Sequence, residues 1–376
     1  MTISTHLDSP SPGSGATQPK KRKLTGSVAG RLIGAQGLLI VVLAFGAALS
    51  FLSPVFLSPI NLINLLYQST ILGVFAIGMT FVILTAGIDV SVGATAAVTS
   101  VLSMGVIVRM GMPDIVGIFA GLLIGIIIGA INGLMVTKLG ISPLIATLAT
   151  LSAGVGLAFA YSDGGNITPV PQILTSAVNA KLFGIPLLIP AVLIIAFIAH
   201  LGLTRTTFGR SIYAVGGNPE AALLAGIRVD RIKMLAYVIC GLTAAIAGLL
   251  LTGRLASGSP RAGDGLELTV IAAVVIGGTS LFGGQGNIKG TLLGVLLISM
   301  VSNAVNLLGI PSSYDKIVQG AVIFAAAALD VYRYKYVQRG LSRRAKLAPP
   351  PSSSASTSTP FSPAPTDSAA SSRAEN

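Results

Sequence analysis

The sequence predicts an all-α fold, a polytopic membrane helix bundle of about ten transmembrane helices. Hydrophobic residues make up 52% of the 376 positions and charged residues only 10%, against about 25% charged residues in typical soluble domains. The mean hydropathy of +0.84 agrees. Apolar stretches recur from residue 31 to residue 332, most of them near the roughly 20 residues that a helix needs to cross a bilayer. One bundle therefore replaces the two or three soluble domains that the length alone would suggest.

The predicted spans are ten stretches in chain order. They are Leu32–Leu52, Leu62–Ala86, Ser91–Met110, Ile115–Val136, Ser142–Tyr161, Leu187–Leu201, Met234–Thr252, Leu268–Leu281, Ile288–Leu308 and Ile317–Tyr332. The sixth, eighth and tenth are short, and short or Gly-interrupted helices in transporters can lie beside a translocation path.

The two ends of the chain differ from this transmembrane domain of residues 31–334. Residues 1–30 are rich in Ser, Pro, Gly and Lys, which predicts a disordered cytoplasmic segment and not a cleavable signal peptide. Residues 335–376 are first basic and then Pro/Ser-rich, which predicts a disordered cytoplasmic tail.

The distribution of charge predicts the orientation. With ten spans and both termini in the cytoplasm, 19 of the 24 Lys and Arg residues lie on the cytoplasmic side, as the positive-inside rule requires. The net charge of +12 therefore indicates membrane topology. It does not indicate nucleic-acid binding, because the aromatic residues are not interleaved with the basic ones.

Glycine patterns mark three places. In the fourth span a glycine recurs every fourth residue from Gly117 to Gly133, a smooth stripe for close helix packing within the bundle or, alternatively, for a subunit or gating interface. Two turns, LTAGIDVSVG at Leu84–Gly93 and IGGTSLFGGQGNIKG at Ile276–Gly290, resemble each other. Both are predicted on the cytoplasmic side, with Asp89 in the first, and they hint at an internal duplication.

Motifs for enzyme chemistry are missing from the sequence. GGQGNIKGT resembles a phosphate-binding loop, but Ile288 stands where a Gly must precede Lys289. The single cysteine, Cys240, and the two histidines, His6 and His200, form no metal or nucleophile pattern. We therefore expect no catalytic residues, metal or cofactor. A transporter without a nucleotide site borrows a motor or uses an ion gradient, and the scarcity of ionisable groups in the spans favours the borrowed motor.

The polar loop at 203–233 contains a short predicted helix. Asn218 can cap it, Pro219 suits its first position, Glu220 favours its first turn, and Gly226 ends it. The glycines at 209, 216 and 217 are expected to form turns beside it. Such a helix is either an ordinary surface helix or one that docks in the groove of a partner.

This loop carries a specific resemblance. Glu220-Ala221-Ala222 followed by Gly226 resembles the EAA-type loop of bacterial ABC importer permeases, and GRSIYAVGGNPEAALLAGI resembles the ribose-type carbohydrate permeases among them. Further strings at Gly78–Gly93, Asn132–Thr150 and Leu268–Gly294 agree, so the resemblance covers roughly residues 32–334. The chain departs from the family pattern at Thr269, where an Asp is usual, and in its long Ser/Pro-rich ends.

The resemblance implies a pore-forming subunit, not itself an enzyme, of an importer that moves a monosaccharide, a ribose-like pentose or a hexose, into the cytoplasm. It implies four partners: an ABC ATPase subunit, a periplasmic sugar-binding protein, a second permease copy (identical or paralogous) and the lipid of the bacterial inner membrane. The residues expected to couple the ATPase to the pore are Gly217, Asn218, Glu220, Ala221, Ala222 and Gly226. The alternatives are a permease for branched-chain amino acids or nucleosides, a gradient-driven secondary transporter, and a membrane receptor or scaffold.

A sugar that leaves water needs hydrogen-bonding partners along its path. The membrane-depth candidates are Gln68, Thr80, Thr95, Thr99, Asn132, Asn303 and Asn306; hydrogen bonding between helices is the alternative role for each. Arg254 and Arg261 lie on the side where cations are scarce, so they are either solvated residues or a docking patch for acidic groups of the binding protein.

Overall fold

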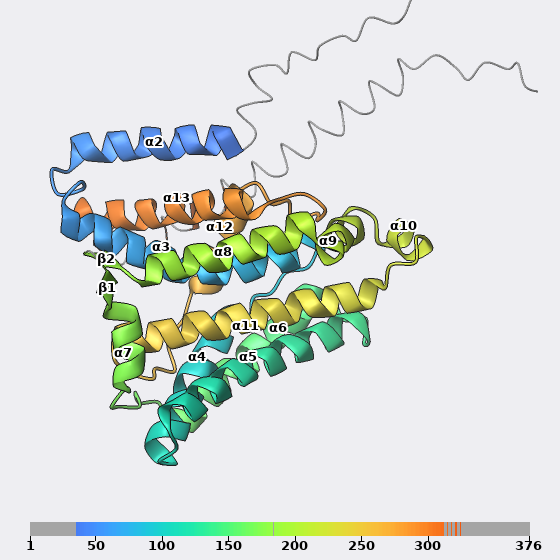
Figure 1. Cartoon of the computed structure of the whole chain (residues 1–376), viewed down its shortest axis with the longest axis horizontal. Coiled ribbons are helices and arrows are strands. Elements are labelled where there is room, and N and C mark those ends of the chain that lie inside the picture. Colours follow the sequence, from blue (N-terminus) through green and yellow to red (C-terminus); the bar gives the residue numbers. More distant parts are fainter. Residues whose placement is uncertain are drawn as a thin grey trace, which may run out of the picture. The chain divides into compact units, whose positions relative to one another are not determined.

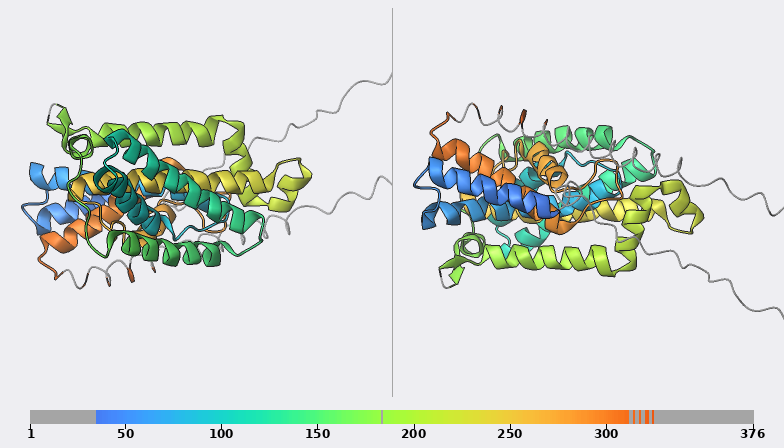
Figure 2. Two further views of the ribbon diagram at one scale, coloured as in Figure 1. Left: turned by 90° about the horizontal axis from the view of Figure 1, so that it is seen from below. Right: turned by 90° about the horizontal axis from the view of Figure 1, so that it is seen from above.

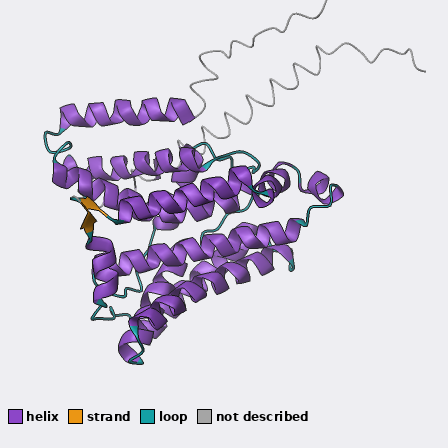
Figure 3. Cartoon of the chain, viewed as in Figure 1, coloured by secondary structure: helices purple, strands orange, loops and turns teal. Residues whose placement is uncertain are grey.

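The computed structural model describes residues 35–311 except 183, together with residues 314, 317, 320, 321 and 324. Its long elements are helices (Figures 1 and 3). They are α2 (Ala35–Leu52), α3 (Pro59–Leu84), α4 (Val92–Met104) with the π-helical turn η1 (Gly105–Arg109), α5 (Asp114–Thr137), α6 (Pro143–Ser162), α8 (Leu188–Arg205), α11 (Val229–Leu255), α12 (Leu266–Ile276) and α13 (Ile288–Leu307). The predicted all-α bundle is confirmed for this part of the chain.

Within the described residues, seven helices are long and apolar enough to cross a membrane: α3, α4 with η1, α5, α6, α8, α11 and α13. The helices α2 and α12 are apolar but shorter. Most of the predicted tenth span and both predicted disordered ends lie outside the described part. The chain is thus a multi-pass membrane protein, and the count of ten spans stays a prediction.

One expectation about an individual span is wrong and another is confirmed. The sixth span was expected to be short, but α8 continues to Arg205, where the Thr204 hydroxyl donates to the carbonyl of His200 at 2.7 Å. The gap before it is also structured, with helix α7 (Gln172–Asn179) and a hairpin of β1 (Lys181–Leu182) and β2 (Ile185–Pro186), in which Leu182 pairs with Ile185. The short eighth span is confirmed, because α12 has 11 residues.

The core lies where α3 and α11 pack together, with α4 and α5 against α11. The glycine stripe of α5 makes this packing possible. A Cβ atom on Gly125 would lie 2.4 Å from the carbonyl oxygen of Gly241, and one on Gly129 would lie 2.4 Å from that of Tyr237. The stripe therefore packs inside this subunit, as the first of its two readings predicts.

The ends of the bundle carry different elements. Helices α9 (Thr207–Gly217) and α10 (Pro219–Leu224) lie at one end, and α7 with the β1–β2 hairpin lies at the opposite end (Figures 1 and 2). The sequence did not predict α9. The glycines expected to form turns, Gly209, Gly216 and Gly217, lie inside this helix, which the Thr206 hydroxyl caps by accepting from the amide of Gly209 at 3.1 Å.

The two turns that resemble each other in sequence also meet in the fold. The amide of Gly284 donates to the carbonyl of Leu84 at 2.9 Å. The first segment, residues 85–91, lies between α3 and α4, and the second, residues 277–287, lies between α12 and α13. The internal duplication that their similarity suggests stays a prediction.

Candidate translocation pocket and coupling surface

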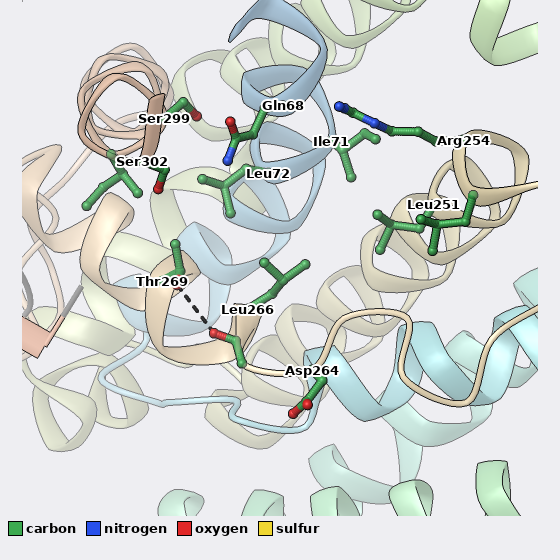
Figure 4. A pocket seen from close by; sticks show the side chains of 13 residues that line it. Gln68, Ile71, Leu72, Leu251, Arg254, Asp264, Leu266, Thr269, Ser299 and Ser302 are labelled. Carbon is green, nitrogen blue, oxygen red and sulfur yellow. Dashed lines mark hydrogen bonds between the residues drawn. The ribbon is translucent and has the colours of Figure 1, made fainter. Parts of the chain in front are cut away.

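A cavity of about 560 Å³ lies between α3, α11, α12 and α13 (Figure 4). Its apolar lining includes Ile71, Leu72, Leu251, Leu266 and Ile298. Its polar lining consists of Gln68 from α3, Arg254 from α11, Asp264 from the loop before α12, Thr269 from α12, and Ser299 and Ser302 from α13. A largely apolar wall with a few convergent polar groups is the usual composition of a small-molecule site.

The helices that line the cavity place their polar side chains in different ways. Ser299 and Ser302 are three residues apart on α13 and therefore share a helical face. The Gln68 side chain is directed toward them (Figure 4). Thr269 lies in the first turn of α12 and donates to the carbonyl of Gly265 at 3.3 Å. Gly265 itself has φ +77°, a conformation that favours glycine and lets the chain turn sharply into this short helix.

One hydroxyl of the cavity is not satisfied by the protein. The oxygen of Ser299 is buried and has no hydrogen-bond partner among the described residues. A buried hydroxyl without a partner costs free energy. A ligand hydroxyl in the cavity would supply the missing hydrogen bond, so Ser299 is a candidate contact for a polar solute.

Two charged side chains also border the cavity. The guanidinium carbon of Arg254 lies 5.8 Å from the ring centroid of Tyr67, in a cation–π arrangement. Asp264 lies at the opposite side of the view in Figure 4. The cavity therefore presents both a cationic and an anionic group in addition to its neutral hydrogen-bonding groups.

The predicted pathway residues do not gather in one place. Gln68 lines the cavity. Thr80 and Thr291 share a hydrogen bond of 2.9 Å between α3 and α13. Thr95 donates to the carbonyl of Ser91 at 3.0 Å, and Thr99 to that of Gly121 at 3.3 Å. Thr80 and Thr99 thus bond between helices, which matches the alternative role given above, whereas Thr95 bonds at the start of its own helix.

The asparagines of α13 point in different directions. The amides of Asn303 and Asn61 form a reciprocal pair, with nitrogen–oxygen distances of 2.7 and 3.1 Å. Asn306 is exposed and donates to the carbonyl of Ser302 at 3.1 Å. Neither lines the cavity. Sequence reasoning named the amides of this helix and missed its serines, because a serine in an apolar helix is common and carries little signal.

Asp89 and Asn132 belong to a separate buried polar cluster. Asp89 was expected at a cytoplasmic turn, but it is only 1% exposed. Its carboxylate accepts from the amide and the hydroxyl of Ser91 at 2.9 and 2.6 Å. Asn132 of α5 donates to the Ser91 hydroxyl at 2.8 Å and accepts from Thr150 of α6 at 2.7 Å. The cluster ties the segment before α4 to two neighbouring helices.

Helix α10 has the geometry that its sequence predicts. The side chain of Asn218 accepts from the amide of Ala221 at 3.0 Å, Pro219 opens the helix, and Gly226 follows it with φ +80°. Ala222 is buried, whereas Leu223 and Leu224 are 65% and 90% exposed. Two neighbouring exposed leucines on a polar loop form an apolar contact surface.

A groove of about 530 Å³ borders α10. It is lined by Pro219, Glu220 and Leu223 of α10 together with Lys138, Arg228, Val229, Asp230 and Arg231. Lys138 forms an ion pair with Asp230 at 3.1 Å. Of the predicted coupling residues, Glu220 lines this groove, whose lining is on balance basic.

Arg254 and Arg261 lie at different cavities. Arg254 borders the large one, and the Arg261 guanidinium lies 5.8 Å from the ring centroid of Phe159 at a second cavity of about 290 Å³. Their role in docking a binding protein stays a prediction, but a substitution of Arg254 would also change the large cavity.

A bundle of apolar helices around a cavity with a few convergent polar groups, and with a short helix that exposes two leucines at one end, has the features of a membrane transport subunit. Residues 61–327 match the family described as the permease component of the branched-chain amino acid transport system, and the chain belongs to this family. The ribose import permease protein of Bacillus subtilis is 47% identical over 296 residues, which cover 78% of this chain and 90% of that protein. That of Escherichia coli K12 is 42% identical over 301 residues, 78% of this chain and 92% of that protein.

A further relative has a different sugar in its name. The L-arabinose transport system permease protein of Escherichia coli K12 is 38% identical over 306 residues, which cover 81% of this chain and 93% of that protein. No solved structure matches the chain.

Proposed function

We propose that this chain is the transmembrane permease subunit of an ABC importer that moves a monosaccharide, ribose or a similar pentose, into the cytoplasm. The relatives named for ribose and arabinose import support the substrate class. The observation that carries the proposal is the cavity between α3, α11, α12 and α13, which combines an apolar wall with neutral hydrogen-bonding groups.

The cavity suits a sugar in transit. The hydroxyls of a pentose need partners when they leave water, and Gln68, Thr269, Ser299 and Ser302 supply an amide and three hydroxyls. The apolar residues can contact the carbon–hydrogen faces of the ring. A site with few polar contacts binds weakly, and weak binding favours release to the cytoplasm.

The remaining subunits are part of the same proposal. A separate ATPase subunit hydrolyses ATP and contacts α10, where Leu223 and Leu224 are exposed beside the basic groove. A periplasmic binding protein delivers the sugar at the opposite end of the bundle, and a second permease copy completes the pore in the inner membrane. Ten spans with both termini in the cytoplasm are the topology that we propose.

A second substrate class has one observation in its favour. Arg254 and Asp264 border the same cavity, and a cation together with an anion suits the carboxylate and ammonium groups of an amino acid. The description of the family, a branched-chain amino acid permease component, points in the same direction.

Uptake into proteoliposomes separates the two classes. The permease is reconstituted with its ATPase and binding protein, and ATP-dependent accumulation of labelled ribose, arabinose and leucine is measured. We expect pentose uptake, with no leucine uptake. Leucine uptake without pentose uptake would replace the proposal by the second class, and uptake driven by an ion gradient without ATP would contradict both.

A further inference from the structure

The end of α9 lies where three stretches of backbone meet. A Cβ atom on Gly216 would lie 1.8 Å from the carbonyl oxygen of Leu84, the last residue of α3, and 2.5 Å from the amide nitrogen of Gly284. Leu84 and Gly284 are themselves joined by a hydrogen bond of 2.9 Å. Only a residue without a side chain fits at position 216, because any Cβ would overlap with both backbones.

A second contact joins α9 to the segment 277–287. The hydroxyl of Tyr213 donates to the carbonyl of Gly286 at 2.9 Å. Burial raises the pKa of Tyr213 above that of an exposed tyrosine, so the hydroxyl keeps its proton at physiological pH. One turn of α9 therefore contacts residues 284 and 286 through two different atoms.

The segment 85–91 is fixed on its other side as well. The Asp89–Ser91–Asn132–Thr150 cluster joins it to α5 and α6, and the hydroxyl of Tyr237 on α11 donates to the carbonyl of Ile88 at 3.3 Å. A segment held by these contacts moves with its neighbours.

Helix α9 is connected to α10 by one residue. The amide of Asn218 donates to the carbonyl of Ala214 at 3.0 Å and so ends α9. Its side chain at the same time caps α10. Because Gly216 is only two residues from Asn218, we expect a displacement of α10 to move Gly216 as well.

The same contacts lead to the cavity. Leu84 ends α3, which carries Gln68. The segment 277–287 connects α12, which carries Thr269, to α13, which carries Ser299. The end of α9 thus touches the end of α3 and the segment that connects α12 to α13.

We propose that the end of α9 is a clamp that joins the motor-facing helix α10 to the helices of the cavity, with Gly216 and Tyr213 as its positioning residues. This inference rests on the proposed function, because it takes α10 as the contact of the ATPase. Movement of α10 shifts the ends of α3, α12 and α13 together and changes the width of the cavity.

Two glycines in neighbouring helices provide a matched test. A Cβ atom on Gly202 of α8 would meet no described atom within 4 Å, so Gly202→Ala makes the same change in an adjoining helix without touching the clamp. Gly216→Ala forces the backbones apart, and Tyr213→Phe removes only the hydroxyl. The quantity measured is the number of sugar molecules imported per ATP hydrolysed by the reconstituted complex. Tyr213→Phe is expected to lower it about fivefold, the effect of one hydrogen bond.

The expected order is a larger loss for Gly216→Ala than for Tyr213→Phe, and a wild-type ratio for Gly202→Ala. Wild-type ratios in both clamp variants would overturn the inference. If Gly216→Ala does not fold, the ratio measured for Tyr213→Phe alone decides the test. A complex that imports no sugar in its wild-type form contradicts the proposed function instead.

Hydrogen exchange tests the clamp without a measurement of sugar transport. Addition of the ATPase subunit with ATP is expected to change the exchange of residues 277–287 in the wild type and in Gly202→Ala, and to change it less in Tyr213→Phe. An equal change in all three proteins would overturn the clamp.

Discussion

Asn61 and Asn303 illustrate how the bundle uses its buried amides. Each side chain satisfies the other across the α3–α13 contact. Asn303→Leu leaves the Asn61 amide without this partner, which costs about 1–3 kcal/mol of stability. We expect a lower thermal unfolding temperature in detergent for this variant.

The double variant Asn61→Leu with Asn303→Leu removes both amides and is expected to recover part of the loss, because the Phe56 carbonyl loses the bond that it accepts from Asn61 at 2.9 Å. Asn306→Leu serves as the control, because Asn306 bonds only to its own helix. An unchanged unfolding temperature in Asn303→Leu would show that the pair does not contribute to stability.

Sequence reasoning at this scale identified one residue of the cavity. Gln68 was predictable, because an amide at membrane depth is rare and needs a partner. Thr269 was singled out only as a departure from the family pattern, and Ser299 and Ser302 were not singled out. Which faces of α3, α12 and α13 meet depends on the tertiary packing, so no spacing within one helix reveals it.

At the scale of single elements, the α5–α11 contact depends on small residues. Gly129→Ala places a methyl group 2.4 Å from the carbonyl oxygen of Tyr237, and overpacking of this kind typically costs about 1–3 kcal/mol. Gly156→Ala in α6 is the control, because a Cβ there meets no described atom within 4 Å.

The unfolding temperatures of both glycine variants, measured in the same detergent, check this contact. Gly129→Ala is expected to unfold at a lower temperature than the wild type, and Gly156→Ala at the same or a slightly higher one. Equal unfolding temperatures for the two variants would mean that α5 and α11 can be forced apart without a loss of stability.

The proposed coupling surface of α10 can be tested without disturbing the fold. Leu224 is 90% exposed, so Leu224→Asp is expected to leave the unfolding temperature unchanged. A carboxylate in an apolar docking contact must be desolvated, so the affinity of the permease for its ATPase is expected to fall at least about tenfold, the effect of roughly 1.4 kcal/mol. Unchanged affinity would place the motor contact elsewhere.

The sequence predicted α10 better than its neighbour α9. The cap, the proline and the terminal glycine are local signals, and each lies where expected. The glycines of α9 suggested turns because glycine disfavours helices. Tertiary contact overrides this preference at Gly216, where the backbones of Leu84 and Gly284 leave no room for a side chain.

At the scale of the whole molecule, the order and approximate bounds of the apolar helices could be predicted from hydropathy. Which helices pack against one another could not. The α5 glycine stripe predicted a close contact but not that α11 is the partner. The similarity of the two turns predicted a relationship, and the fold places them in contact at Leu84 and Gly284.

The central claim is that the sugar passes through the cavity between α3, α11, α12 and α13. The most direct test is ATP-dependent ribose uptake by proteoliposomes that contain Gln68→Leu with Ser299→Ala, compared with Ser69→Ala. Ser69 is a matched control, because its hydroxyl is also buried without a partner among the described residues, and it does not line the cavity. We predict that ribose uptake by the double variant falls about tenfold or more, the effect of roughly two hydrogen bonds. Its unfolding temperature and its binding of the ATPase stay at the wild-type level, and Ser69→Ala transports ribose normally. Wild-type uptake by the double variant would contradict the account.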